Sequence, residues 1–488
     1  MTKNAEAEGS FGSALFHSFA GKYVTITLQL ISSIVLARII APEEYGLFAV
    51  ALIFAGFAAI IKEFGVNNYL VKQKTLSPEI ISSAYGTSLV IASVVATSLV
   101  LLAYPISHFY QEPELVPILH LLSLNILLSP FGSIIDCLLK RQLLFKPALI
   151  ANITSQFLSV VGMIILAMND FGVYALVYGS LIQTISQALM FQFFRPANMP
   201  LLPSLKKSRE ILSYSKFVGI SGVVSYFSNQ FNVLLSGRFF TLEVTGLLDR
   251  ASSTASLFSK LFSEALNPVI MPYMSMLNRK GGNFIAKLEF LTKLTLSLSW
   301  PFYIILGLCA EPVIFVLFGD QWSTSAYFLK IMCVGLTVSS SVQLIEPFML
   351  GLGMAKSLMK IILTLSIVRI AISLCTMQYG LMVMIVANTL TLPILRFTLF
   401  LIVMNKAEVF NYKEFLQWLK DPAILLIACS FPLVLLNLYF GENWWRQYTF
   451  AAIGLGCTIV LWLLVIIKQG NAAPIYDLIK SKLKKSAS

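Results

Sequence analysis

The sequence predicts an all-α polytopic membrane protein with about 14 transmembrane helices, arranged as two like-oriented six-helix bundles followed by two C-terminal helices. Three observations lead to this prediction: an apolar composition, regularly spaced apolar segments, and an internal repeat that relates the two halves of the chain. Of the 488 residues, 57% are hydrophobic and only 12% are charged, and the mean hydropathy is +0.81. A water-soluble protein of this length would be much more polar. Most of the chain is therefore expected to lie in lipid.

Apolar segments long enough to cross a bilayer core, which takes about 20 helical residues, recur along the whole chain. They are expected at residues 18–38, 44–62, 83–104, 116–138, 148–168, 172–194, 214–236, 246–276, 292–310, 325–350, 358–378, 380–404, 421–440 and 448–467. The connections between them are short and leave no room for a soluble domain.

The repeat is clearest in two turns. The chain reads RIIAPEEYGL from Arg38 to Leu47 and RFFTLEVTGL from Arg238 to Leu247, so that Arg, Glu, Gly and Leu recur in register. Further along, the offset between the copies increases slightly through loop insertions, as the Phe171-Gly172 and Tyr379-Gly380 turns show. Each half contains six spans, and because six is even, both halves enter the membrane in the same orientation.

This repeat predicts the organisation of the chain. The parts are a cytoplasmic N-terminal segment (1–17), a first six-helix bundle (18–195), a cytoplasmic linker (196–212), a second bundle (213–405), helices 13 and 14 (406–468) and a basic cytoplasmic tail (469–488). Duplication of this kind predicts a cavity between the halves.

The formal net charge of +12 raises the question of nucleic acid binding, but the positions of the charges argue against it. With a cytoplasmic N terminus, the lysines and arginines fall in the even-numbered loops and the tail, and the other loops hold only Arg38, Arg238 and Arg446. This asymmetry is typical of the positive-inside rule and predicts that both termini are cytoplasmic. It also predicts contact with anionic membrane lipids, and no nucleic acid partner. The N-terminal residues show no cleavable signal peptide.

Polar side chains lie at helical spacing on three of the expected spans. The positions chosen as cavity lining are Thr25, Gln29, Ser32, Ser225, Asn229, Asn232 and Asn267. A polar helix face is unfavourable in lipid, so these faces are expected to turn inward. The alternative is that Ser and Asn only join helices through interhelical hydrogen bonds.

Charged residues inside the expected spans are the most specific chemical signal, because a charge at the bilayer centre costs at least about 2.5–3.5 kcal/mol. The cations are Arg250, Arg369, Lys260 and Arg396, and they are candidates for binding an anionic ligand. The acids are Asp136, Asp249, Glu264 and Glu346, and they are candidates for ion coupling. The alternatives are structural. Lys260 and Glu264, at i, i+4 spacing, can pair with each other, and Asp136 and Glu346 can pair with a nearby Lys or Arg. Arg369 can have a structural partner on another helix, and Arg396, nearer the end of its span, can extend its charge to the interface.

Catalytic motifs are absent from the sequence. It contains no Walker loop, dinucleotide fingerprint, HExxH or GxSxG, and its three histidines lack metal-ligand spacing. We therefore expect no catalytic residues, no metal site and no cofactor.

Two stretches of the chain resemble the signatures of bacterial polysaccharide flippases. The first consists of Val35 to Glu43, Tyr45-Gly46-Leu47, Glu63-Phe64-Gly65 and Gln73-Lys74. The second consists of Gly246, Asp249-Arg250-Ala251, Asn267-Pro268 and Met271-Pro272. In the second signature Tyr-Asn-Arg-Ala is usual, whereas this chain has Leu248 and Asp249 before Arg250. The resemblance extends from about Phe11 to about Val465 and places the chain in the multidrug/oligosaccharidyl-lipid/polysaccharide (MOP) exporter superfamily.

The resemblance implies a MATE-like inner-membrane transporter that is not an enzyme. It implies that an undecaprenyl-pyrophosphate-linked oligosaccharide moves from the cytoplasmic to the periplasmic leaflet by alternating access, for surface polysaccharide biosynthesis. The expected partners are this lipid-linked oligosaccharide and membrane lipids, and the candidate protein partner is a polysaccharide polymerase complex. Two alternatives stay open: an ion-coupled multidrug or small-molecule antiporter of the same superfamily, and a membrane polysaccharide polymerase or ligase.

Overall fold

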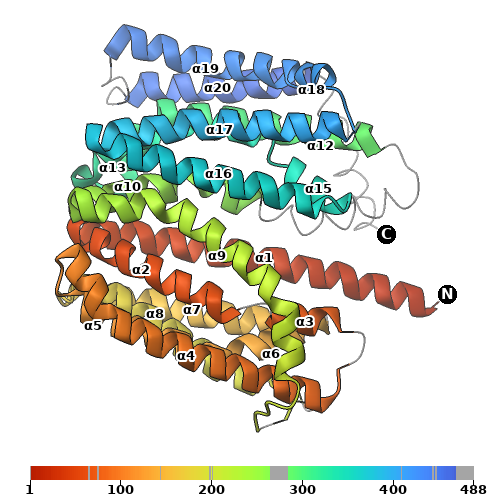
Figure 1. The fold of residues 1–488 in the computed structure, drawn as a ribbon. Helices are drawn as coiled ribbons and strands as arrows, with labels where there is room; N and C mark the ends of the chain where they lie inside the picture. The colour runs from red at the N-terminus through yellow and green to blue at the C-terminus, as the bar shows by residue number, and fades with distance from the viewer. Residues whose placement is uncertain are drawn as a thin grey trace. The chain divides into compact units, whose positions relative to one another are not determined.

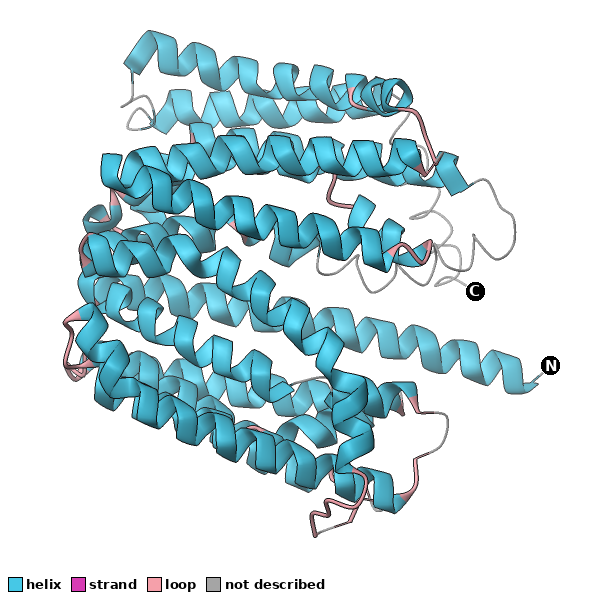
Figure 2. Ribbon diagram, viewed as in Figure 1, coloured by secondary structure: helices cyan, strands magenta, loops and turns pink. Residues whose placement is uncertain are grey.

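The computed structural model describes residues 2–63, 66–73, 76–142, 144–196, 199–200, 202–263, 284–407, 409–441, 445 and 448–468. Every regular element among these residues is a helix, as Figures 1 and 2 show. Lipid offers no hydrogen-bond partners to a peptide group, so a spanning segment has to satisfy its backbone internally, which a helix does. The prediction of an all-α polytopic membrane protein is confirmed.

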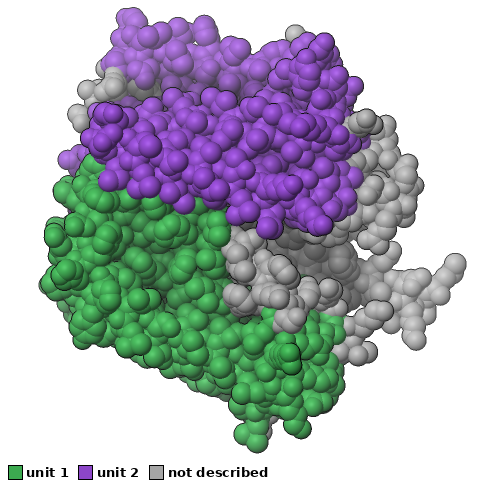
Figure 3. Space-filling view, in the orientation of Figure 1, with its two compact units in different colours: residues 1–249 green, residues 250–488 purple. Residues whose placement is uncertain are grey.

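The chain divides into two compact units, residues 1–249 and 250–488, which Figure 3 shows in green and purple. The helices that begin in the first unit are α1 (Thr2–Ile39), α2 (Pro42–Glu63), α3 (Val66–Lys72), α4 (Pro78–Tyr110), α5 (Leu115–Leu128), α6 (Pro130–Arg141), α7 (Phe145–Met168), α8 (Val173–Phe193), α9 (Ser208–Phe239) and α10 (Leu242–Ala255). The helix α10 contains the boundary between the units. The bundle limits expected from the repeat, with a linker at 196–212, stay a prediction.

The second unit contains a π-helix, η1 (Ser259–Ser263), and two 3₁₀ turns, η2 (Asp320–Trp322) and η3 (Met377–Tyr379). Its α-helices are α12 (Phe284–Leu308), α13 (Ala310–Phe318), α14 (Ser325–Ser340), α15 (Ile345–Gly351), α16 (Ala355–Thr376), α17 (Leu381–Lys406), α18 (Tyr412–Trp418), α19 (Lys420–Phe440) and α20 (Tyr448–Lys468). Here α14 packs against α12 and α17, and α19 packs against α12 and α20.

Among the described residues, 10 helices are long and apolar enough to cross a membrane, and the bent pair α5 and α6 raises the number to 11. The bend between α5 and α6 is 41° and lies at Pro130, the first residue of α6. Proline has no backbone N–H and its ring clashes with the preceding turn, which is why a span that contains it bends or breaks. The multi-pass architecture is therefore established, while the number of 14 spans stays a prediction.

The repeat in the sequence has a counterpart in the helix boundaries. Helix α1 ends at Ile39 and α9 at Phe239, and α2 begins at Pro42 and α10 at Leu242. The members of each pair are related by the same offset as Arg38 and Arg238. In both copies of the turn, therefore, one helix ends and the next begins at equivalent positions.

The later turns of the two halves also match. Gly172 precedes α8 with φ +52°, and Gly380 precedes α17 with φ +104°. Side-chain-bearing residues rarely adopt positive φ, so both turns favour glycine.

Buried core positions recur in register between the two units. In the first unit, Ile134, Ile135, Leu138 and Leu139 of α6 are buried in one cluster with Ala148 and Ala151 of α7. In the second unit, the buried cluster around α15 and α16 contains the equivalent residues, all displaced by one constant offset: Leu344, Ile345, Phe348, Met349, Leu358 and Ile361. The duplicated sequence therefore builds two equivalent cores.

The short helix α3 is held in place by Arg141 at the end of α6. The guanidinium of Arg141 donates hydrogen bonds to the backbone carbonyls of Leu70 and of Gln73, the latter at 2.6 Å. These carbonyls lie at the C-terminal end of α3, where a helix has no internal donors left for them. On the same helix, the Tyr69 hydroxyl donates to Glu210 of α9 at 2.7 Å. Burial, and then the Glu210 carboxylate, raise the pKa of Tyr69 to about 12, so the hydroxyl keeps its proton at neutral pH.

We predict that Arg141→Ala lowers the free energy of unfolding by about 1–3 kcal/mol, because it leaves two helix-end carbonyls without their charged donor. The neighbouring Lys140→Ala is the matched control. The Lys140 side chain is 51% exposed and forms only an i, i+4 ion pair with Asp136, so we expect a loss below about 1 kcal/mol. Thermal unfolding of the purified protein can be followed with a thiol-reactive dye, since Cys137, Cys309, Cys333 and Cys429 are buried. Equal melting temperatures for the two variants would contradict this account of α3.

Candidate functional site

The polar stripe of α1 is only partly buried. Ser32 is 7% exposed, and its hydroxyl lies 3.9 Å from the sulfur of Met163 in α7. Thr25 is half-buried and Gln29 is exposed. Ser32 therefore fits the helix-joining alternative, whereas the more accessible Thr25 and Gln29 fit the cavity interpretation.

The corresponding stripe of α9 shows the same gradation. Asn229 is exposed, while Ser225 and Asn232 are half-buried. The Tyr226 hydroxyl lies against Gly56 of α2, and Ser228, two residues later and so on nearly the opposite side of the helix, is 2% exposed. The stripe of α9 therefore lies between the contact with α2 and a buried position.

Arg250 is fixed by aromatic rings. Its guanidinium carbon lies 4.8 Å from the ring centroid of Phe318 and 4.8 Å from that of Trp322, and the residue is only 5% exposed. A guanidinium over aromatic faces is attracted by the ring quadrupoles, and this attraction offsets part of the desolvation of the charge. The sequence identified Arg250 as an intramembrane cation, but the two rings come from α13 and η2, much later in the chain, and could not be predicted from it.

Lys260 lies in the π-helix η1, and its side chain is half-buried. Single π-turns within helices often mark functional sites. Beside it, Phe258 stacks on Phe262 with ring centroids 4.8 Å apart. The predicted site residues Glu264 and Asn267 lie outside the described residues, and so the Lys260–Glu264 alternative stays untested.

Arg396 and Glu346 pair in the second unit across α17 and α15. Arg396 donates a hydrogen bond to Glu346 at 2.5 Å, and its guanidinium carbon lies 5.7 Å from the Phe400 ring centroid. Arg369 of α16 is half-buried within electrostatic range of Arg396. The predicted cation Arg396 and the predicted acid Glu346 thus form an ion pair between two helices, and the charge of Arg396 acts on the predicted cation Arg369.

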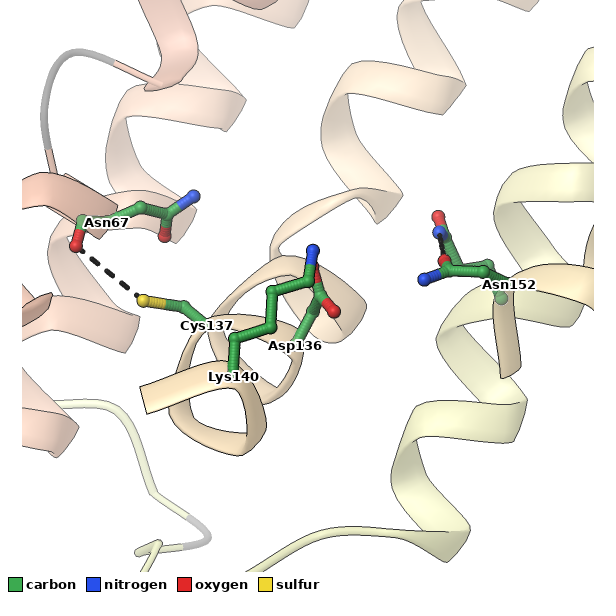
Figure 4. A network of polar contacts seen from close by, with 6 residues as sticks. Asn67, Asp136, Cys137, Lys140 and Asn152 are labelled. Carbon is green, nitrogen blue, oxygen red and sulfur yellow. Dashed lines mark hydrogen bonds and ion pairs between the residues drawn. The ribbon is translucent and has the colours of Figure 1, made fainter. Parts of the chain in front are cut away.

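Asp136, the acid related to Glu346 by the repeat, is paired locally. Its Oδ2 accepts a hydrogen bond from Lys140 at 2.6 Å, while its Oδ1 is buried without a hydrogen-bond partner in the structure. Figure 4 shows this pair beside the contact of the Cys137 thiol with the Asn67 carbonyl oxygen. Asp249 is half-buried and ends the first unit, next to Arg250.

A ladder of amides and hydroxyls inside the first unit was not foreseen from the sequence. Its hydrogen bonds run from Asn125 to Ser180 (2.8 Å), from Gln183 to Gln156 (3.0 Å) and from Gln187 to Asn152 (2.7 Å). The signal was present, because Asn152 and Gln156, and likewise Gln183 and Gln187, lie one helical turn apart on their helices. Paired amides of this kind join helices within lipid.

Lys62, at the end of the expected span 44–62, is only 6% exposed. Its ammonium donates a hydrogen bond at 2.9 Å to the hydroxyl of Ser129, the residue just before the Pro130 break. The buried ammonium therefore lies at the C-terminal end of α5, where unpaired carbonyls favour a positive charge.

No group of three or more His, Cys, Asp or Glu side chains suited to a metal ion occurs in the described part of the chain. The polar groups that are brought together are hydrogen-bond donors, acceptors and guanidiniums. Such groups bind anionic and hydroxyl-rich ligands rather than metal ions.

Several known proteins are similar to this chain in sequence. The "Succinoglycan biosynthesis transport protein ExoT" of Rhizobium meliloti is 27% identical over 340 residues, which cover 69% of this chain and 68% of that protein. The "Lipopolysaccharide biosynthesis protein WzxC" of Escherichia coli is 22% identical over 320 residues, which cover 64% of each chain, slightly less than two thirds.

Solved structures share the fold. A structure described as "Lipid II flippase MurJ, inward closed conformation" superposes with a TM-score of 0.71 at 16% identity, covering 95% of this chain and 99% of that one. An inward-facing MATE multidrug transporter of the MOP superfamily superposes with a TM-score of 0.59 at 13% identity, covering 79% and 95%. The expected MATE-like fold is confirmed. The family model described as "Polysaccharide biosynthesis protein" matches residues 35–327, more than half of the chain, and the chain therefore belongs to this family.

Proposed function

We propose that this protein is a flippase that moves lipid-linked oligosaccharides, with an undecaprenyl pyrophosphate carrier, from the cytoplasmic to the periplasmic leaflet for surface polysaccharide biosynthesis. Its family and the names of its relatives, which include a transport protein and a "Probable low-salt glycan biosynthesis flippase", support a transporter rather than an enzyme. The glycan moves through the protein while the lipid tail stays in the bilayer, which suits a multi-pass helical protein with no soluble domain in its described part.

The observation that carries this proposal is that Arg369 of α16 and Arg396 of α17, both on membrane-spanning helices, lie within electrostatic range of each other. Two like charges in a weakly polar environment repel each other, and an anion between them is attracted by both. Guanidiniums bind the oxygens of a phosphate in a bidentate manner, so the pair fits a diphosphate. The exposed amides Gln29 and Asn229 are suited to hydrogen bonding with sugar hydroxyls.

Glu346 gives this site a way to couple transport to an ion gradient. A diphosphate that binds Arg396 competes with the Glu346 carboxylate for the same guanidinium. The displaced carboxylate then becomes an isolated charge within the membrane, and it is neutralised by taking up a proton or a cation. Substrate binding and ion uptake are linked in this proposal because both act on the Arg396–Glu346 pair.

The proposal includes a bacterial inner-membrane location with both termini in the cytoplasm, alternating access of the two repeats, and a polymerase complex as the protein partner. The lysine and arginine asymmetry of the loops supports the orientation. The antiporter alternative, which predicts an acidic binding site, is disfavoured by the presence of two arginines, Arg369 and Arg396, on membrane-spanning helices. The polymerase or ligase alternative would require catalytic groups on a large periplasmic loop, and the connections between the described helices are too short for it.

We predict that Arg369→Ala lowers the initial rate of leaflet translocation in proteoliposomes at least about tenfold, because one of the two guanidiniums that attract the diphosphate is lost. Arg369→Lys should restore the rate only in part, since an ammonium keeps the charge but not the bidentate geometry. The measurement is the appearance of a lipid-linked oligosaccharide in the outer leaflet per mole of folded protein.

The matched control is Arg250→Ala, which removes another intramembrane arginine. Because Arg250 is held by Phe318 and Trp322, we expect a lower melting temperature and a smaller change in rate per folded molecule. If Arg369→Ala translocates at the wild-type rate, the site at Arg369 and Arg396 is wrong. If the wild-type protein moves no lipid-linked oligosaccharide, the proposed function itself is wrong.

We predict that Glu346→Gln retains translocation but loses its dependence on an imposed ion gradient, because the glutamine needs no neutralising proton or cation. The readout is the ratio of initial rates with and without the gradient. Asp136→Asn, at the repeat-related position, is the control, and its ratio should stay as in the wild type. A gradient dependence that survives in Glu346→Gln would rule out coupling through this carboxylate.

A further inference from the structure

The two turns that revealed the repeat are in contact with each other. Within the first unit, the first turns of α2 and α10 lie against one another at Gly46 and Gly246. A methyl group on Gly46 would meet the carbonyl oxygen of Leu242, and one on Gly246 would meet the carbonyl oxygen of Pro42. The contact is reciprocal, because Pro42 and Leu242 are themselves equivalent positions of the repeat, each the first residue of its helix.

This contact is between backbones, with no space for even the smallest side chain. A Cβ on Gly46 would lie 2.6 Å from the carbonyl carbon of Leu242 and 3.0 Å from the amide nitrogen of Gly246. A Cβ on Gly246 would lie 2.9 Å from the amide nitrogen of Gly46 and 3.0 Å from the carbonyl carbon of Pro42. Glycine allows helices in membranes to approach this closely, and Cα–H groups then face the carbonyl oxygens.

The helix α10 is held at two points one turn apart. Gly246 is held against α2 in the first unit, whereas Arg250 is stacked on Phe318 and Trp322 in the second unit. A movement of α10 has to release one of these contacts. The Arg250 contact involves a buried charge and two rings, and its release would expose the charge to a weakly polar environment. The nearest atoms across the Gly46–Gly246 contact belong to the backbone, and its release would separate no charge from its partner.

We infer that Gly46 and Gly246 form a latch that closes the periplasmic ends of α2 and α10 and opens when the transport site faces the periplasm. The periplasmic location of the latch rests on the proposed function, which includes the orientation of the chain in the membrane. In that orientation, supported by the positive-inside asymmetry, both turns lie on the periplasmic side. Separation of the two turns exposes side chains that are now buried around them, namely Tyr45, Leu47, Leu242 and Leu247. The two glycines thus set the balance between the closed and open states.

The test uses accessibility rather than transport. Leu242, which is 8% exposed, is replaced by Cys in a variant that lacks the six native cysteines, and intact cells are treated with a membrane-impermeant maleimide. Gly46→Ala and Gly246→Ala should each raise the labelling rate of this cysteine by about fivefold or more, because either methyl group forces the two backbones apart. The double variant should add little to either single variant, since both act on the same contact.

Two glycines serve as matched controls. Gly456 in α20 has no atom within 4 Å of an added Cβ, and Gly56 in α2 meets only the end of the Tyr226 side chain, which can rotate away. Gly456→Ala and Gly56→Ala should therefore leave the labelling rate within about twofold of the parent. Labelling that is equally slow in the latch variants and the controls would overturn the latch.

A measurement on the unsubstituted protein guards against variants that fail to fold. Hydrogen exchange in lipid nanodiscs is followed in peptides that cover residues 40–50 and 240–250. A latch opens both turns in one event, so the two peptides should give the same free energy of opening once their intrinsic exchange rates are divided out, and clearly different opening free energies would contradict it. Neither readout needs substrate, so the two proposals can fail separately. If the wild-type protein translocates no lipid-linked oligosaccharide, the flippase proposal is wrong and the latch is unaffected. If labelling is unchanged in the latch variants, only the latch is wrong.

Discussion

The constraint on which this structure depends is that a chain in lipid has to satisfy its polar groups from within. The backbone does so through helices, and hydroxyl side chains often donate to the carbonyl one turn earlier, as Thr337 does to Cys333 at 2.8 Å. Larger polar groups need a partner on another helix, and the paired amides of α7 and α8 provide one. Charged groups need an opposite charge, a ring face or a helix end, and Arg396, Arg250 and Lys62 illustrate these three solutions.

Duplication is the second constraint, and it acts on packing more strongly than on chemistry. The buried positions of α6 and α15 match in register, and so do the helix boundaries around Gly46 and Gly246. The charged residues match less well, because Asp136 pairs with Lys140 on its own helix while Glu346 pairs with Arg396 on another. Two copies can thus keep the same core and differ in the groups that hold a ligand.

The sequence predicted the fold because the signals that define it are local or periodic. Apolar length predicts spans, and the repeated turn predicts matching helix ends. The site was predicted as a set of residue types, and from that set the structure pairs Arg396 with Glu346 and places Arg369 within electrostatic range of Arg396. Glu264 and Asn267 lie outside the described residues, and their roles stay predictions.

The sequence could not predict the tertiary partners, because these depend on which helices become neighbours. Examples are the rings beside Arg250, the burial of Lys62 at Ser129, and the contact of Gly46 with Gly246. Periodicity indicates which face of a helix is buried, and does not indicate against which helix.

The group that contacts each intramembrane arginine also indicates which role that arginine can have. A guanidinium held by a carboxylate is exchangeable, because a phosphate offers the same planar pair of oxygens and can replace the carboxylate without moving the arginine. The Arg250 guanidinium also lies against the rings of Phe318 and Trp322, and an anion cannot imitate the attraction of a ring face. Intramembrane arginines that are alike in the sequence therefore divide into one group suited to binding and one suited to anchoring a helix. In the proposed latch, Arg250 anchors the half of α10 that follows Gly246 while the preceding turn is released, and the proposed alternating access requires a helix with these two properties.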